Sequence, residues 1–215
     1  MNIIIKKIRI MLLITITLSF LGFSCNRDTT RPCANSTAYS FKVTADWTPQ
    51  QEVYNIGDTI FLNSEFPKIL TDYTTINSQQ INYGNSIGIA GNLSTGQIDT
   101  VSHKVLSAAS KFSYISYIGI TTDISGTPEN GKNILFAEQA NTYKFKLGLI
   151  VKQKGIFLLG IPNLLSQGII NENCTNASFE MSVTNSDKHI SLYQYALGFP
   201  PDADALKRIY CFRVQ

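Results

Sequence analysis

Residues 142–161 read TYKFKLGLIVKQKGIFLLGI, and this stretch carries the clearest local pattern in the chain. In residues 143–151 almost every second side chain is apolar, which gives a strand one buried and one exposed face. Residues 152–155, Lys-Gln-Lys-Gly, have the composition of a turn, and residues 156–161 return as a continuous apolar strand. The stretch therefore predicts a β-hairpin.

The same period of two recurs on both sides of this stretch. Apolar and polar side chains alternate in residues 39–45 and again in residues 177–183, and residues 209–214 close the chain as a further strand. Residues 54–60 have the pattern Tyr-x-Ile-Gly-Asp-Thr-Ile, which resembles the entry to a strand in bacterial immunoglobulin-like domains. That resemblance implies a turn at Gly57 and Asp58.

Composition favours strands over helices in the rest of the chain. Charged residues make up 15% of the sequence, and much of its polarity comes from Asn, Ser and Thr, beside many Tyr and Phe. Residues 190–197 and 201–208 are expected to form short helices. We therefore predict an all-β fold, an antiparallel Ig-like β-sandwich with one or two short helices near the C-terminus.

The first 25 residues differ from the rest. Lys6, Lys7 and Arg9 form a basic head, and an uncharged run follows in residues 10–24. That run is shorter than the about 20 apolar residues that a membrane-spanning helix needs. A basic head and a short apolar core predict a secretory signal, and Cys25 stands where cleavage is expected.

The residues Gly22-Phe23-Ser24-Cys25 resemble the looser lipoboxes of Bacteroidota lipoproteins. The resemblance implies that residues 1–24 are a lipoprotein signal peptide and that Cys25 is acylated. It implies a cell-envelope location, and Asn26 favours the outer membrane, with its periplasmic or surface face left open. Residues 25–36 are then a lipidated cysteine and flexible tether, and residues 37–215 a single β-sandwich domain. The alternative is a signal in which Cys25 is an ordinary residue.

The net charge of +3 belongs to the predicted signal. The chain has 18 Lys and Arg and 15 Asp and Glu, and the signal contains three of the basic residues and no acidic one, which leaves 15 of each. The remainder gives no electrostatic argument for nucleic acid as a partner. The partner that the sequence predicts is a membrane, bound through the lipid on Cys25.

Three cysteines remain once Cys25 is assigned to the lipid. An oxidising compartment permits one disulfide among them. Cys174 precedes a predicted strand and Cys211 lies in the last one, so we favour a Cys174–Cys211 bridge. Cys33 in the predicted tether is a competitor for that bridge, and three free thiols are the other alternative.

No catalytic motif occurs in the sequence. His103 and His189 lie outside any zinc-binding spacing, and there is no Gly-x-Ser-x-Gly elbow, phosphate loop or Cys-x-x-Cys. We therefore predict no enzyme activity, no cofactor and no metal site. Two carboxylates that meet only in the folded chain remain an alternative, because glycosidases need no sequence motif for that.

Trp47 is the candidate for an exposed ring on which a sugar could stack, because it lies two residues before Pro49 at the end of a predicted strand. The sequence as a whole predicts a non-enzymatic, membrane-anchored envelope lipoprotein that acts by binding or assembly. One alternative is a surface glycan-binding accessory protein. Another is a fimbrillin-like adhesion or assembly subunit, which needs a sheet edge that accepts a donor strand. In these two alternatives the protein's partner is a glycan or an envelope protein.

Overall fold

The computed structural model describes residues 37–215 apart from residues 77, 125–130, 162, 173, 185 and 187–188. The predicted signal peptide, the lipidation site Cys25 and the predicted tether with Cys33 lie outside the described residues. Asn35–Gln215 forms one compact unit. Within the described part of the chain, no helix is both long and apolar enough to cross a membrane.

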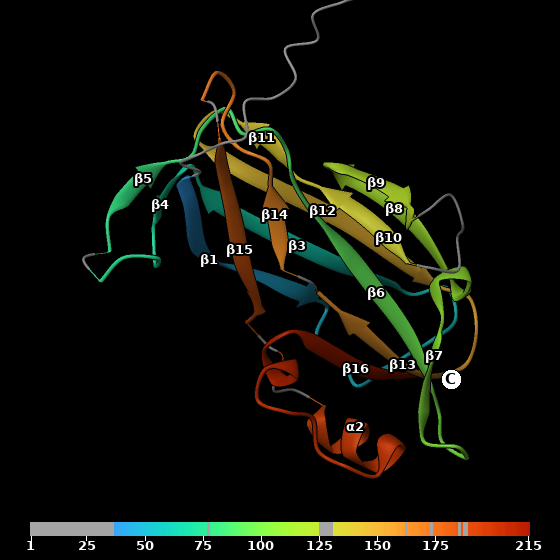
Figure 1. Cartoon of the computed structure of the whole chain (residues 1–215). Helices are drawn as coiled ribbons and strands as arrows, with labels where there is room; N and C mark the ends of the chain where they lie inside the picture. The colour runs from blue at the N-terminus through green and yellow to red at the C-terminus, as the bar shows by residue number, and fades with distance from the viewer. Residues whose placement is uncertain are drawn as a thin grey trace, which may run out of the picture. The chain divides into compact units, whose positions relative to one another are not determined.

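Most strands belong to one continuous sheet that folds over into two layers (Figure 1). The first layer contains β1 (Thr37–Thr48), β3 (Thr59–Pro67), β12 (Thr142–Val151), β11 (Ala137–Gln139) and β8 (Phe112–Ile118). The second contains β15 (Thr175–Val183), β14 (Leu164–Ser166), β6 (Ile89–Asp99), β13 (Gly155–Gly160), β16 (Ile209–Val214), β2 (Val53–Tyr54), β7 (Lys104–Ser107), β10 (Lys132–Leu135) and β9 (Ile120–Asp123). A separate small sheet pairs β4 (Ile69–Thr71) with β5 (Gln80–Asn82).

Strand β1 joins the two layers. Its residues 37–45 pair with β15, and its residues 46–48 pair with β3. The β1–β15 and β16–β2 pairs are parallel, and the other pairs are antiparallel. The predicted all-β sandwich is therefore confirmed, with two parallel pairs that the sequence pattern did not indicate.

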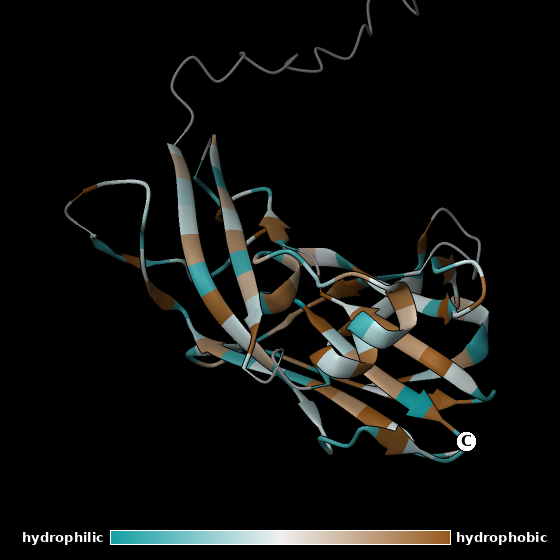
Figure 2. Cartoon of the chain, turned by 90° about the horizontal axis from the view of Figure 1, so that it is seen from below, coloured by the Kyte–Doolittle hydropathy of each residue, from teal (hydrophilic) through white to brown (hydrophobic). Residues whose placement is uncertain are grey.

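The core lies between the layers and is rich in aromatic rings. The period-two patterns place their apolar side chains there, and Figure 2 shows the resulting alternation of colours along the strands. Phe66 of β3 lies 5.8 Å from Phe179 of β15, and Phe112 of β8 lies 5.2 Å from Phe157 of β13, both measured between ring centroids. Each such side chain contributes about 1.5–3 kcal/mol by leaving water.

The predicted hairpin at residues 142–161 is wrong, although both of its strands form. Strand β12 pairs with β3 and β8, whereas β13 pairs with β6 and β16. Residues 152–155 therefore carry the chain from one layer to the other. The physical reason is that Leu149 and Phe157 are both fully buried, because each strand turns its large side chains into the shared core from its own layer.

Both predicted C-terminal helical segments form, the first with the predicted bounds and the second as a shorter turn. Helix α2 (Ile190–Leu197) has the expected bounds, and a 3-10 turn, η4 (Ala205–Lys207), lies inside the second predicted segment; a further 3-10 turn, η1 (Ala109–Lys111), precedes β8. Leu192 and Leu197 of α2 are buried in a second apolar cluster with Cys211 of β16. The helix thus covers part of the second layer.

Candidate functional site

The outer face of β1, β3, β12 and β8 carries polar, charged and aromatic side chains that strand pairing aligns in two rows. The members of the polar row are Asp46, Asn63 and Lys146. The members of the aromatic row are Thr48, Phe61, Gly148 and Ile115. The rows follow from sequence parity, because neighbouring positions such as Ile60 and Leu62 point into the core.

A β-bulge in β8 adds Tyr117 to the aromatic row. Leu147 pairs with Ser116, and Lys146 pairs with Ile118, so Tyr117 is the extra residue between them. Bulges re-aim a side chain in this way. The Tyr117 ring lies 5.7 Å from the Phe61 ring at an interplanar angle of 61°, and Tyr117 is 54% exposed.

Gly148 provides the space that Tyr117 occupies. A Cβ atom at position 148 would lie 3.1 Å from Cε2 of Tyr117 and 3.2 Å from Cγ2 of Thr59. A glycine inside a strand often marks such a close approach. The bulge and the glycine together create a pair of adjoining rings, Phe61 and Tyr117, on the outer face of the sheet; we call this pair the aromatic platform.

Lys146 places a positive charge at the aromatic platform. Its ammonium lies 5.3 Å from the centroid of Phe61 and 5.6 Å from that of Tyr117, which is within the range of cation–π attraction, about 6 Å. Its neighbour in β12, Lys144, instead forms an ion pair with Glu65 at 2.8 Å. Among the described residues, no carboxylate forms an ion pair with Lys146.

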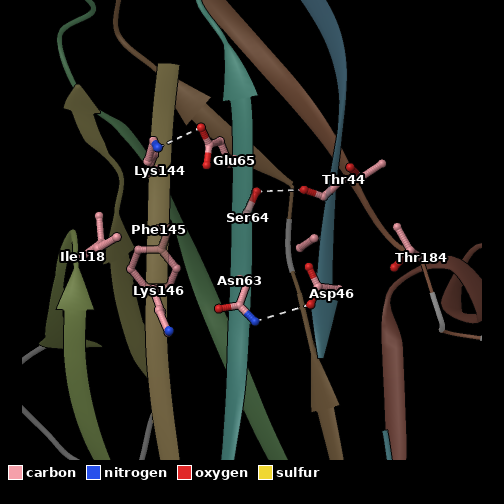
Figure 3. Close-up of a pocket in the computed structure, with 11 residues that line it drawn as sticks. Thr44, Asp46, Asn63, Ser64, Glu65, Ile118, Lys144, Phe145, Lys146 and Thr184 are labelled. Carbon is pink, nitrogen blue, oxygen red and sulfur yellow. Dashed lines mark hydrogen bonds and ion pairs between the residues drawn. The ribbon is translucent and has the colours of Figure 1, made fainter. Parts of the chain in front are cut away.

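A hollow of about 370 Å³ lies beside the aromatic platform, and Figure 3 shows its lining. Lys146 lines this hollow and also contacts both rings of the platform. The Nδ2 of Asn63 donates hydrogen bonds to Oδ2 of Asp46 at 3.3 Å and to Oγ1 of Thr48 at 2.8 Å. The hollow therefore offers amide, carboxylate and ammonium groups next to an exposed ring.

The prediction that Trp47 offers an exposed ring is wrong. Trp47 is 0% exposed, and its ring stacks on Tyr210 with a centroid distance of 6.1 Å and an angle of 24°. The reason is its register, because Trp47 pairs with the inward Leu62, whereas Thr48 pairs with the outward Phe61. Strand parity alone could have indicated Phe61, but nothing in the sequence indicates the bulge at Tyr117.

The predicted Cys174–Cys211 disulfide is also wrong. Cys211 is a free thiol and is buried, and Cys174 is disulfide-bonded to a different partner. Four strand spacings separate β15 from β16 in the sheet order, which is roughly 19 Å, whereas bridged cysteines have Cα atoms no more than about 7 Å apart. Burial, with a smaller contribution from the charge of Glu52, raises the pKa of the Cys211 thiol to about 12.

Glu138 and His103, which lie outside the outer face, have local structural partners. Burial raises the pKa of Glu138, but its ion pair with Lys68 at 2.5 Å and the N–H of Asn85 outweigh this, so the pKa is lowered overall. The Nδ1 of His103 lies 3.0 Å from the carbonyl oxygen of Ala196. In the described part of the chain, no three His, Cys, Asp or Glu side chains are arranged to hold a metal ion.

Asp202 and Asp204 lie at a short helical turn. Oδ1 of Asp202 accepts hydrogen bonds from the N–H groups of Asp204 at 3.0 Å and Ala205 at 2.6 Å. Asp204 in turn forms an ion pair with Arg208. This pattern is that of a carboxylate at the start of a helical turn.

These features define an all-β sandwich protein with an aromatic and polar outer face. No protein-family model matches the sequence, and no curated protein matches it. Among solved structures, the human F-spondin reeler domain is similar at 9% identity over 89% of this chain and 100% of that domain, with a TM-score of 0.34. A cohesin module from a Clostridium perfringens family 33 glycoside hydrolase is similar at 12% identity over 66% of this chain and 98% of that module, with a TM-score of 0.30.

Proposed function

We propose that this chain is a lipid-anchored, non-enzymatic binding protein of the bacterial cell envelope and that it binds a glycan on the outer face of β3, β12 and β8. The observation that carries the glycan proposal is the aromatic platform, where Tyr117 is half exposed beside Phe61. The polar hollow adjoins this platform through Lys146.

Sugars present two kinds of surface, and the outer face offers a counterpart to each. The C–H groups on one face of a pyranose are apolar and pack on an aromatic ring, as other flat or apolar groups do. Its hydroxyls need hydrogen-bond partners, and Asp46, Asn63 and Lys144 provide both donors and acceptors in the hollow. A binding site commonly combines an apolar surface with a few convergent polar groups in this way.

The anchor in this proposal rests on the sequence of residues 1–25. The basic head, the short apolar run and Cys25 are arranged as in lipoproteins with loose lipoboxes. Two or more acyl chains hold a protein stably at a bilayer, because each buried methylene contributes about 0.8 kcal/mol. An anchor in the outer membrane would place the protein within reach of envelope or environmental polysaccharides.

The glycan proposal is tested by affinity electrophoresis of the full-length protein in detergent through gels that contain soluble polysaccharides. We expect at least one polysaccharide to retard the wild type and to leave Tyr117→Ala unretarded, while Tyr117→Phe keeps the ring and the retardation. Equal migration of the wild type and Tyr117→Ala in every gel would refute glycan binding at this site.

The anchor is tested separately by metabolic labelling with a palmitate analogue in a bacterial host. The wild type should carry the label, and Cys25→Ala should not. Labelling of both proteins to the same extent would remove the lipid anchor from the proposal and would leave the glycan site untouched.

A further inference from the structure

We infer that the glycan bound at the aromatic platform is acidic: a pyranose that carries a ring-bound carboxylate stacks on Tyr117 and pairs that carboxylate with Lys146. This inference rests on the proposed glycan site and names its substrate class. It adds a charge requirement that stacking alone does not impose.

The first argument is the charge that Lys146 leaves uncompensated. Four lysines of the described chain have a carboxylate partner within 4.0 Å, namely Lys68, Lys132, Lys144 and Lys207, and Lys146 is among the lysines that have none. Lys146 has only the two rings, although it is part-buried and lies between them and the hollow. A part-buried ammonium attracts an anion more strongly than one in bulk water, because the effective dielectric constant is lower.

The second argument is the distance between the charge and the stacking surface. The Lys146 ammonium lies 5.6 Å from the centroid of Tyr117. A carboxylate bound to a pyranose projects from the edge of the ring, so a sugar stacked on the exposed part of Tyr117 directs it toward that ammonium. Hydrogen bonds to an ionised group are about twice as strong as neutral ones, so this contact would dominate the choice of sugar.

The third argument is the arrangement of negative charge, which gives the bound sugar one orientation. Asp46 and Glu65 line the hollow, on strands β1 and β3, whereas Tyr117 lies on β8 at the other side of Lys146. A carboxylate over the hollow would meet the like charge of Asp46, because Glu65 is already paired with Lys144, whereas a carboxylate on the Tyr117 side would meet the ammonium of Lys146. The neutral hydroxyls of the neighbouring sugar unit are then placed over the hollow.

A second exposed lysine–tyrosine pair provides a matched control. The Lys42 ammonium lies 4.8 Å from the centroid of Tyr73, and Tyr73 is 49% exposed. The two pairs have the same chemistry, but Tyr73 has no ring partner like Phe61 among the described residues, and Lys42 and Tyr73 do not line the hollow. Variants at this pair therefore control for non-specific attraction of polyanions to lysine and tyrosine.

The experiment compares an acidic polysaccharide, polygalacturonate, with a neutral one, galactan, by titration calorimetry on the full-length protein in detergent. The variants are Tyr117→Ala and Lys146→Gln at the site and Tyr73→Ala and Lys42→Gln as controls, and thermal unfolding confirms that all five proteins are folded. We expect the wild type to bind polygalacturonate about tenfold or more tightly than galactan, and both site variants to lose about that factor. The preference should decline as salt rises from about 0.05 to 0.5 M, because salt screens the pair.

The outcomes separate this inference from the function on which it rests. If the wild type binds both polysaccharides equally, or if Lys146→Gln keeps the preference, the acidic class is refuted while the glycan site stands. If neither polysaccharide binds, the acidic class is refuted for this sugar acid and the glycan site is decided by the electrophoresis panel; if Tyr117→Ala binds as the wild type does, the glycan site fails too. A loss of equal size in the Lys42→Gln control would show non-specific charge attraction and would also refute the inference.

Discussion

Two pairs of contacting aromatic rings lie in opposite environments in this protein. Trp47 and Tyr210 stack in the core, and both are fully buried. Phe61 and Tyr117 contact each other at a similar distance on the outer face, where Tyr117 is half exposed. Trp47 and Phe61 are separated by one step of register between β1 and β3. The comparison teaches that alternation along a strand, rather than the kind of ring, decides whether an aromatic side chain serves stability or binding.

The Tyr210 ring of the buried pair also carries a hydroxyl that links β16 to the segment before β2. Tyr210 donates a hydrogen bond to the carbonyl of Gln51 at 2.9 Å, and its hydroxyl lies 3.0 Å from that of Tyr54. Burial and the hydrogen bond to Tyr210 raise the pKa of Tyr54, so the hydroxyl stays protonated and can donate to the carbonyl of Pro49. These polar tips satisfy one another inside an apolar cluster.

The buried pair should contribute far more than the exposed pair to the free energy of unfolding. Trp47→Ala removes a large, fully buried ring and should lower the free energy of unfolding by about 3–5 kcal/mol. Tyr117→Ala removes a half-exposed ring and should change it by less than about 1 kcal/mol. Urea denaturation measures both, and a similar cost for the two variants would contradict the assignment of one ring to the core and the other to the surface.

A buried carboxylate extends the comparison from rings to charge. Burial raises the pKa of Asp72, but hydrogen bonds from the N–H of Ser40 and from the hydroxyl and N–H of Thr74 outweigh it, so the pKa lies below the ordinary value of 3.8. Asp72→Ala leaves those donors unpaired and should cost about 1–3 kcal/mol. Because the folded pKa is the lower one, this stabilisation is complete above about pH 4 and is lost as the pH falls further.

The sign of this pH dependence can be measured by urea denaturation between about pH 2 and 6. The wild type should lose stability below about pH 4 more steeply than Asp72→Asn, which keeps a hydrogen-bonding side chain and does not titrate. If the free energy of unfolding fell in parallel with pH for the two proteins, Asp72 would not contribute to the loss of stability in acid.

A smaller change tests how the platform is built. Gly148→Ala places a methyl group 3.1 Å from Tyr117, and the exposed ring can move aside, so we expect a stability loss below about 1 kcal/mol. Polysaccharide binding should nevertheless weaken because Tyr117 is displaced. Gly84→Ala is the matched control, since its Cβ would meet Asn82 and Lys68 at 3.2 and 3.3 Å, and neither residue lines the hollow beside the platform. Retained binding in Gly148→Ala would show that the ring position is not needed.

The smallest expected effect concerns the cysteines. The buried Cys211 thiol should not react with iodoacetamide at pH 8 in the folded protein, because burial raises its pKa to about 12 and only the thiolate is the nucleophile. It should react in urea, which exposes the thiol. Cys174 should be protected under both conditions by its disulfide. Its carbonyl accepts a hydrogen bond from the N–H of Thr37, so we expect the non-reduced peptide map to join Cys174 to Cys33, four residues earlier in the sequence. A Cys174–Cys211 peptide would contradict the structure.

Much of the fold could be read from local patterns. The strands at residues 177–183 and 209–214 and the helix at 190–197 were predicted within about two residues, because each has its own period and its own buried face. The partners of these strands could not be read in the same way. The pattern at residues 142–161 is that of a hairpin, yet β12 and β13 pair with strands from distant parts of the sequence.

The candidate site was less accessible from the sequence than the fold. Trp47 was chosen for its size and its place near a proline, and its register placed it in the core instead. Tyr117 reaches the outer face only because a bulge shifts the register of β8. A bulge depends on both paired strands, so neither strand reveals it alone.

Local sequence is enough to predict the all-β class, the inward positions of most strands and the two C-terminal helical segments, because these follow from short-range periodicity and turn chemistry. It also provides the whole basis for the predicted lipid anchor at Cys25, which lies outside the described residues. The pairing of the strands, the cysteine that stays free and the rings that reach the surface are established by the folded chain. Those outcomes depend on register between strands far apart in the chain, where a shift of one residue exchanges the buried and exposed faces.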